Sequence, residues 1–368
     1  RSTLFPYTTL FRSPYRLSCE DVVRAYLHRI STYDQATGLN AITAVANDAL
    51  AQAVAADQRL RRGEPRSPLF CVTVVVKDNI NTKDLPTTGG SSVLRDNRPA
   101  ADAPVVRALR GAGAIILAKT NMAEWAFSPR RTISSTAGET ANAYALDRVP
   151  AGSSGGTASA IAASFATVGL GTDTGNSIRG PSSHLALVGM RPTYGRVSLQ
   201  GVIPLLLDRD AVGPMTRTVE DNARVLSVVA TSASDHEPSA TDYVAQLSSV
   251  PLRGTRIGVL RALACADSMD PQIAKLFAAA IADLRAAGVV VIDDVVIEKF
   301  QTHVDDGDYC PRFRADVNAY LQSLGRGAPV TDIAEVFKQG RFAPASHDQF
   351  AYFLNLNPEL YGDRKSVV

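Results

Sequence analysis

Apolar residues recur at helical spacing in two segments near the N-terminus. In residues 20–34 they fall on one face of a helix, and Ser18 with Asp21 has the pattern of a capping box at its start. Residues 46–63 are rich in alanine and end at Gly63, a typical residue after a helix. We therefore predict a helix in each segment.

A different pattern, a nearly continuous β-branched run, follows at residues 69–79. Such a run is typical of a strand buried on both faces. A helical pattern at residues 102–113 and a second apolar run at 114–121 come next, and strand, helix and strand at this spacing predict a parallel crossover. Residues 251–298 repeat the order, which favours a layered α/β sheet.

Composition and charge narrow the class of protein. Of the 368 residues, 45% are hydrophobic and 20% charged, as in ordinary globular proteins. The 38 basic and 36 acidic residues leave a net charge of +2, too balanced for a nucleic-acid-binding surface. The small apolar run at residues 158–170 is shorter than the roughly 20 residues of a membrane span, and polar residues interrupt it. We expect neither a nucleic-acid partner nor a membrane span.

The cysteines show no metal-binding spacing. Cys19, Cys71, Cys265 and Cys310 are scattered, without a C-x-x-C pair or a histidine nearby. We therefore expect free thiols in a reducing compartment, a cytoplasmic location, no metal site and no cofactor.

The two ends of the chain differ from the rest. Residues 1–13 have neither a signal-peptide pattern nor helical periodicity, and they and residues 363–368 resemble translated sequencing adapters. A genuine extended arm is the alternative for residues 1–13. We expect two non-native segments that flank a single domain over residues 14–362, which would make the chain a fragment of a longer protein.

Three segments carry candidate chemistry: residues 74–79 (VVVKDN), 150–160 (PAGSSGGTASA) and 171–180 (GTDTGNSIRG). The glycine-rich segments border residues 157–170, which we expect to pack as a helix with small side chains, so they are not a flexible linker. Neither G-x-x-x-x-G-K-[ST] nor G-x-G-x-x-G is present, which disfavours a phosphate loop. The esterase elbow G-x-S-x-G is disfavoured because its second glycine is misplaced.

A serine nucleophile activated by lysine fits these segments better than a Ser-His-Asp triad. The latter would pair Ser177 with His184, and an isolated histidine is more often structural. Lys77 ends the predicted buried strand, where desolvation lowers its pKa and lets it act as a neutral base. A tight turn at residues 174–177 could aim backbone N–H groups at a developing oxyanion.

These three segments resemble the amidase signature family, which has a K-D-N-like strand end, a G-S-S-G-G loop and a G-T-D-T-G-G-S-I-R loop. The similarity continues in order from about Ser18 to about Ala230. It implies the fold of that family, a large mixed, mainly parallel β-sheet covered by helices on both faces. It also implies that the single domain is C-terminally truncated here.

The resemblance places a Ser–cis-Ser–Lys triad on Lys77, Ser153 and Ser177, because the family keeps its serines 24 residues apart and 177 − 153 = 24. It implies that Ser177 attacks the acyl carbon and that Ser153, in a cis peptide after Gly152, relays the proton to Lys77. Ser154 would support the lysine through a hydrogen bond.

Further roles around the triad are implied in the same way. The oxyanion hole would be formed by the backbone amides of Thr174, Gly175, Asn176 and Ser177. Two residues would fix the loop without doing chemistry: Asp173 and Arg179. Candidates for an acyl pocket are Met122, Trp125 and Phe127, for which core packing is the alternative.

One residue and two segments depart from the family pattern. Asn176 replaces the second glycine of the nucleophile loop, and we expect asparagine to tolerate the left-handed backbone that glycine would allow there. Residues 179–189 and 70–76 also differ from the family's usual segments. These departures predict a sub-branch whose substrate preference cannot be transferred from relatives.

The resemblance implies a hydrolase of amide C–N bonds that works through an acyl-enzyme and releases a carboxylic acid with ammonia or an amine. We expect a small-molecule amide substrate. For the oligomeric state, a homodimer is the hypothesis to test. Two alternatives stay open: a component of a tRNA-dependent glutamine amidotransferase, and an inactive truncated fragment.

Overall fold

The computed structural model describes most of the chain: residues 17–231, 241–247, 251–264, 269–293, 295–300, 302 and 310–356. The chain divides into two compact units, one over residues 1–243 and 310–368 and a smaller one over residues 244–309. The predicted non-native segments, 1–13 and 363–368, lie outside the described residues.

The larger unit holds most of the secondary structure. Its strands are β1 (Ile42–Val45), β2 (Thr73–Lys77), β3 (Ile115–Thr120), β4 (Ile133–Ser134), β5 (Gly138–Glu139), β6 (Val168–Asp173), β7 (Val188–Gly189) and β8 (Ala211–Thr216). Its α-helices are α2 (Cys19–Tyr33), α3 (Ala49–Arg61), α4 (Pro104–Gly111), α5 (Gly155–Ala162), α6 (Arg179–His184), α7 (Val219–Val229), α12 (Phe313–Ser323), α13 (Ile333–Lys338) and α14 (His347–Asn355). Short 3-10 turns lie at η1 (Ser92–Leu94), η2 (Glu124–Ala126), η3 (Gly325–Gly327) and η4 (Pro344–Ser346).

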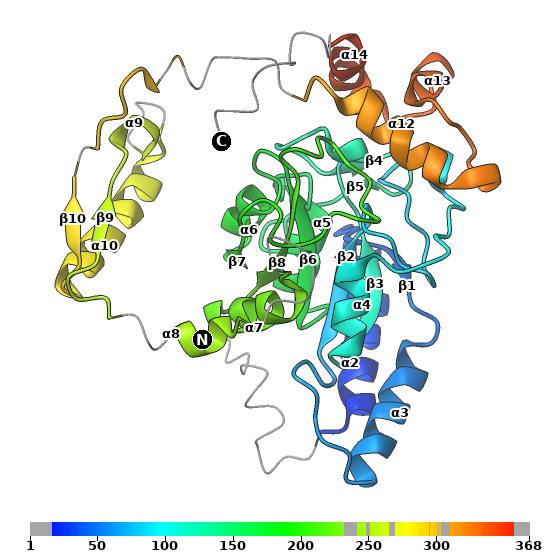
Figure 1. Cartoon of the computed structure of the whole chain (residues 1–368), viewed down its shortest axis with the longest axis horizontal. Coiled ribbons are helices and arrows are strands. Elements are labelled where there is room, and N and C mark those ends of the chain that lie inside the picture. The colour runs from blue at the N-terminus through cyan, green and yellow to red at the C-terminus, as the bar shows by residue number, and fades with distance from the viewer. Residues whose placement is uncertain are drawn as a thin grey trace. The chain divides into compact units, whose positions relative to one another are not determined.

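Six strands of this unit form one mixed sheet in the order β1-β3-β2-β6-β8-β7 (Figure 1). The central strands β3, β2 and β6 are parallel, with Val74 opposite Ile116 on one side and Val168 on the other. The strands β1, β8 and β7 pair antiparallel with their neighbours. The α/β fold and the parallel crossover from β2 through α4 to β3 are confirmed.

The central strands are buried along their whole length, as the β-branched run at 69–79 predicts. Val74, Val75 and Val76 belong to the main hydrophobic core. Because β2 and β6 are parallel, Lys77 and Asp173 end neighbouring strands at the same edge of the sheet. The carboxyl ends of such strands are the usual place for a site in an α/β sheet.

The capping box at the first helix is confirmed. The backbone N–H of Asp21 donates to Oγ of Ser18 at 3.0 Å, and the backbone N–H of Ser18 donates to the Asp21 carboxylate at 3.0 Å. The helix predicted over residues 157–170 is wrong in its second half. There α5 ends at Ala162 and β6 starts at Val168, because the glycines of β6 let this strand pass close under α5. A Cβ at Gly169 would lie 2.4 Å from Cγ2 of Thr157.

The expectation of four free thiols is wrong for two cysteines. Cys19, at the start of α2, and Cys71, before β2, are joined by a disulfide with a Cα–Cα distance of 5.6 Å. These residues are 52 positions apart, and only the packing of α2 against the core brings them together. Cys310 is buried, and Cys265 lies outside the described residues.

The smaller unit confirms the second predicted strand, helix and strand. Its strands β9 (Arg256–Gly258) and β10 (Val290–Ile292) pair in parallel, and α10 (Pro271–Ala286) connects them. The carboxylate of Asp270 accepts the backbone N–H of Gln272 at 2.7 Å and so caps α10. Of two short helices, α8 (Tyr243–Leu247) precedes β9, and α9 (Arg261–Ala264) lies between β9 and α10. Within the residues that the structure covers, no helix has both the length and the apolar character to cross a membrane.

The start of α5 packs so closely on the core that we expect Gly156→Ala to destabilise the fold. A Cβ at Gly156 would lie 2.2 Å from the carbonyl oxygen and 2.7 Å from the nitrogen of Asn121, both backbone atoms. Overpacking of this kind costs about 1–3 kcal/mol of unfolding free energy. The matched control is Gly111→Ala, at the end of α4, where an added Cβ meets nothing within 4 Å. Thermal or urea unfolding should show a loss for the first variant, whereas equal stability of both would contradict this packing.

Candidate active site

Lys77 ends β2, and its side chain is fully buried. Its Nζ lies 2.7 Å from Oγ of Ser153 and 2.8 Å from Oγ1 of Thr172. Thr172, in the strand next to β2, is a part of the site that sequence reasoning missed. The motif at residues 171–180 contains Thr172 directly before Asp173, so this motif could have indicated Thr172 as a site residue.

Burial lowers the pKa of Lys77 to about 7, and the nearby carboxylates of Asp173 and Asp210 oppose this shift. A lysine in water has a pKa near 10.4 and is almost always charged. At a pKa of about 7, a substantial share of Lys77 is a neutral amine at neutral pH. The sequence-based expectation of a lysine that can act as a base is consistent with this geometry.

The predicted cis peptide is present between Gly152 and Ser153. Gly152 is held tightly, because its N–H donates to the carbonyl of Pro129 at 3.0 Å and an added Cβ would lie 2.4 Å from the Ser128 carbonyl oxygen. The hydroxyl of Ser154 donates to the carbonyl of Thr172 at 3.1 Å. Ser154 therefore reaches Lys77 through Thr172, not by the direct contact that we expected.

Asp173 organises the loop that carries Ser177. Its carboxylate accepts the backbone N–H of Ile178 at 3.1 Å and Nε of Arg179 at 3.1 Å, and Nη1 of Arg191 lies 3.3 Å away. Burial alone would raise the pKa of Asp173, but the Arg179 guanidinium and the Ile178 amide lower it below its usual value. The loop is thus fastened to a carboxylate that stays ionised.

The loop at residues 174–177 leaves backbone donors available. In the part of the chain that the structure describes, the amides of these four residues donate no hydrogen bond, whereas Asp173 engages the next two, at Ile178 and Arg179. The side chain of Ser177 is mostly buried. Free N–H groups beside a serine are what stabilisation of an oxyanion requires.

Asn176 is accommodated differently from our expectation. Its backbone does not adopt a positive φ, so the left-handed tolerance of asparagine is not used. Its carbonyl accepts the N–H of Gly180 at 2.8 Å, and its side chain rests against Gly180, where an added Cβ would lie 2.2 Å from Nδ2 of Asn176. The glycine at position 180 makes room for the asparagine.

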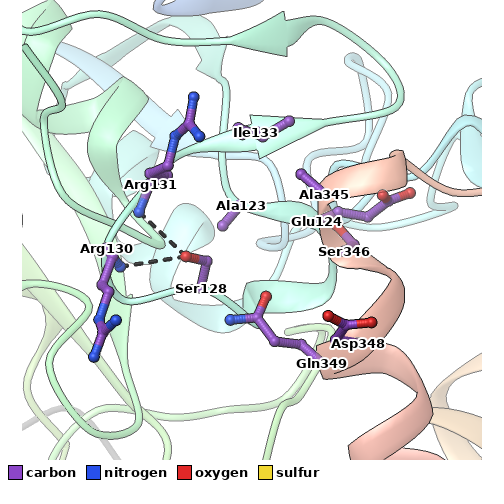
Figure 2. Close-up of a pocket in the computed structure, with 10 residues that line it drawn as sticks. All are labelled: Ala123, Glu124, Ser128, Arg130, Arg131, Ile133, Ala345, Ser346, Asp348 and Gln349. Carbon is purple, nitrogen blue, oxygen red and sulfur yellow. Dashed lines mark hydrogen bonds between the residues drawn. The ribbon is translucent and has the colours of Figure 1, made fainter.

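A cavity of about 310 Å³ lies between residues 123–133 and residues 345–349 (Figure 2). Its lining residues are Ala123, Glu124, Ser128, Arg130, Arg131, Ile133, Ala345, Ser346, Asp348 and Gln349. The backbone N–H of Ala123, a lining residue, donates to the backbone carbonyl of Ser153 at 3.0 Å, which links the cavity to the segment that carries the cis-serine.

The residues suggested for an acyl pocket lie in the core beside this cavity. Met122, Trp125 and Phe127 are at most 4% exposed, and the lining side chains between them belong to Ala123 and Glu124. Phe127 packs against Phe313, Phe350 and Phe353, with ring centroids 5.0–5.2 Å apart. Met122, Trp125 and Phe127 therefore pack in the core, which was the alternative considered from the sequence. Their role in substrate binding stays a prediction.

Glu124 lines the cavity and connects residues 123–133 with the segment before η4. The sequence analysis did not identify it. Its carboxylate accepts the hydroxyl of Ser135 at 2.5 Å and the backbone N–H of Ala343 at 2.6 Å, and burial raises its pKa. Ala343 is 219 residues away in sequence, so no local pattern could have revealed the contact. Over the described residues, no group of three or more His, Cys, Asp or Glu side chains comes together to hold a metal ion.

Comparison with known proteins shows the family of the chain. The family model for amidases matches residues 21–348. The chain belongs to the amidase signature family. Among curated relatives, a glutamyl-tRNA(Gln) amidotransferase subunit from Desulforapulum autotrophicum is 39% identical over 75% of this chain, and its counterpart from Acidothermus cellulolyticus is 42% identical over 73%. The matches span 57% and 54% of those two proteins, so the chain corresponds to little more than half of each.

Solved structures of the amidase signature family superpose closely on the chain. The peptide amidase of Stenotrophomonas maltophilia is 35% identical with a TM-score of 0.80, covering 90% of this chain and 69% of that one. An amidase family protein of Bacillus anthracis is 30% identical with a TM-score of 0.82, covering 95% and 71%. The amidase-signature fold predicted from the sequence is confirmed.

Proposed function

We propose that the chain hydrolyses amide C–N bonds through an acyl-enzyme formed on Ser177. The observation that carries this proposal is the contact between Lys77 and Ser153, in which a buried amine of lowered pKa meets a serine hydroxyl at 2.7 Å. The amides of residues 174–177, which donate no hydrogen bond within the described residues, support it. A small-molecule amide remains the expected substrate, and a homodimer and a cytoplasmic location remain predictions.

Each group has a definite task in this mechanism. Oγ of Ser177 attacks the acyl carbon while its proton passes through Ser153 to Nζ of Lys77. The amides of residues 174–177 stabilise the negative charge on the acyl oxygen. The proton then returns through Ser153 to the leaving nitrogen, the C–N bond breaks, and water attacks the ester on Ser177 with the same groups acting in reverse.

Trapping the acyl-enzyme tests the proposal directly. The chain is incubated with a panel of small aliphatic, aryl and peptide amides, with and without hydroxylamine. A covalent intermediate should yield hydroxamate in proportion to the added hydroxylamine, and mass spectrometry should locate the acyl group on Ser177. Amide hydrolysis without hydroxamate and without an adduct on Ser177 would rule out the acyl-enzyme.

The rate of amide hydrolysis should rise with pH through neutrality. Burial lowers the pKa of Lys77 to about 7, and only its unprotonated form accepts the proton, so kcat/KM should fall as pH decreases through 7 and level off above 8. The measurement is kcat/KM for one amide between pH 5 and 9. A rate that stays constant across pH 6–8 would contradict the role of Lys77 as the base.

The curated relatives favour a second candidate function, the amidase-type component of a tRNA-dependent glutamine amidotransferase. Two amidotransferase subunits are 39% and 42% identical to the chain. Ammonia release from glutamine, measured alone and with candidate partner proteins, separates the two functions. Release that depends on a partner supports the second. Efficient hydrolysis of other amides by the chain alone supports the first.

An inactive fragment is the remaining alternative, because the chain spans little more than half of those relatives. Thermal melting of the purified chain tests it. A cooperative transition together with turnover of any amide excludes this alternative, whereas the absence of both supports it.

A further inference from the structure

Asp210 is a buried carboxylate that the proposed acyl-enzyme mechanism leaves without a task. It lies directly before β8 and is 4% exposed. Its carboxylate accepts the hydroxyl of Thr174, and its Oδ2 accepts the backbone amides of Leu205 and Leu206 at 2.9 and 3.2 Å. A buried ionisable group is costly unless its contacts compensate it, so this arrangement calls for an explanation.

The sheet register brings Asp210 to the nucleophile loop. Strands β6 and β8 pair antiparallel with Asp173 opposite Ala211. One step beyond this pair, Thr174 follows Asp173 and Asp210 precedes Ala211, so the two side chains meet across the strand ends. Thr174 is the first of the four residues whose amides are proposed to form the oxyanion hole. Its side chain therefore fastens the start of that loop to the adjacent strand.

The charges around Asp210 give it an electrostatic connection to the base as well. Asp173 has its own cations in Arg179 and Arg191, and Arg191 also reaches the backbone carbonyl of Arg209. Asp210 instead relies on the hydrogen bonds from Thr174 and the two leucine amides, and its charge acts on Lys77 and on Tyr194.

We propose that Asp210 is a positioning residue that holds Thr174 so that the 174–177 amides converge. Its negative charge also stabilises the ammonium form of Lys77 during proton transfer. This inference rests on the proposed function of Ser177 and Lys77. Burial raises the pKa of Asp210 to about 6, so the carboxylate is mostly ionised at the pH where Lys77 acts.

A sulfonyl fluoride tests this role without knowledge of the natural substrate. Phenylmethylsulfonyl fluoride forms a bond between Oγ of Ser177 and sulfur, fluoride leaves, and the serine proton passes to Lys77, so the inactivation rate reports the nucleophile and its base. The rate is measured from pH 5 to 9 for the unaltered chain, Asp210→Asn, Thr174→Val and Thr174→Ser, and mass spectrometry confirms the labelled residue.

The variants should separate positioning from charge. Asp210→Asn should lower the plateau rate about 10- to 100-fold, the scale of a displaced catalytic group, and should move the half-maximal pH downward because Lys77 loses a nearby negative charge. Thr174→Val should lower the plateau and should move the half-maximal pH less than Asp210→Asn does, because it keeps the Asp210 carboxyl group. Thr174→Ser keeps the hydroxyl and should recover most of the rate.

Asp316→Asn is the matched control. Asp316, on α12, is also a buried carboxylate, and it accepts the backbone amide of Leu207 at 3.0 Å in the same segment, but it does not contact Thr174. This variant should keep both the plateau and the half-maximal pH. Equal losses in Asp210→Asn and Asp316→Asn with no pH shift would mean a purely structural role and would overturn the proposal.

The outcomes also distinguish this inference from the proposed function. If Ser177→Ala is inactivated as fast as the unaltered chain, the nucleophile is misassigned and the proposed function fails. If inactivation requires Ser177 but Asp210→Asn shows an unchanged pH profile, only the inference about Asp210 fails. Should Asp210→Asn not fold, the Thr174 variants decide, because a Thr174→Val rate equal to that of the unaltered chain refutes the positioning contact.

Discussion

Ser177→Ala should abolish amide hydrolysis, with a loss in kcat on the order of 10⁴–10⁶-fold. In the proposed mechanism Ser177 carries the acyl group, so its removal leaves only the binding and oxyanion contributions. The fold should be preserved, since Ser177→Ala removes a single oxygen atom and keeps the Cβ. The measurement is kcat/KM for the best amide of the panel, together with the melting temperature.

A second serine in the same segment supplies the control for this variant. Ser182, on α6, is buried, and its hydroxyl has no hydrogen-bond partner within the described residues, so Ser182→Ala removes a hydroxyl nearby without touching the triad. It should keep activity within about twofold and stability within about 1 kcal/mol. Hydrolysis that persists in Ser177→Ala at the level of Ser182→Ala would show that Ser177 is not the nucleophile.

The contact of Lys77 with Ser153 and the cis peptide before Ser153 could be anticipated from sequence, because these residues lie in short segments with distinctive local chemistry. Lys77 follows an unbroken run of valines, and a buried strand that ends in lysine is unusual enough to indicate a function. The cis-serine could be chosen over its neighbour Ser154 by the interval of 24 residues to Ser177. Each of these inferences needs only residues that are adjacent in sequence, together with the family resemblance.

The supporting contacts could not be predicted, because they join distant parts of the chain. Asp210 meets Thr174 only through the register of β6 with β8, and Glu124 meets Ala343 only because the C-terminal helices return to the core. The disulfide between Cys19 and Cys71 depends on the packing of α2 in the same way. Spacing in the sequence carries little information about such pairs.

The secondary structure shows the same contrast between features that local sequence determines and features that distant contacts determine. The helices and strands with strong periodicity appear where expected, with ends displaced by a few residues. The helix predicted over residues 157–170 fails only in its second half. The segment is rich in alanine and other small residues, which suit a helix and a closely packed strand equally well. Tertiary packing decided between the two, because Gly169 allows a contact with Thr157 that no larger residue would permit.

Lys77→Ala should lower kcat about 10²–10⁴-fold, the usual contribution of a general base, and should remove the fall in rate below pH 7. The truncation leaves a space beside Oγ of Ser153, which the amine of Lys77 approaches to 2.7 Å in the unaltered chain. A small amine such as methylamine can enter that space and accept the proton, so added amine should restore part of the rate.

Lys119→Ala is the control that separates base chemistry from burial. Lys119 is also fully buried and burial lowers its pKa to about 8, but its Nζ donates to the carbonyl of Ile80 at 2.7 Å and to Thr87 at 2.9 Å, away from both serines. Its truncation should reduce stability and should not respond to methylamine. Only a missing proton acceptor can be replaced by an amine in solution. Lys77 would therefore be structural if methylamine restored both variants equally, or if it failed to restore a folded Lys77→Ala variant.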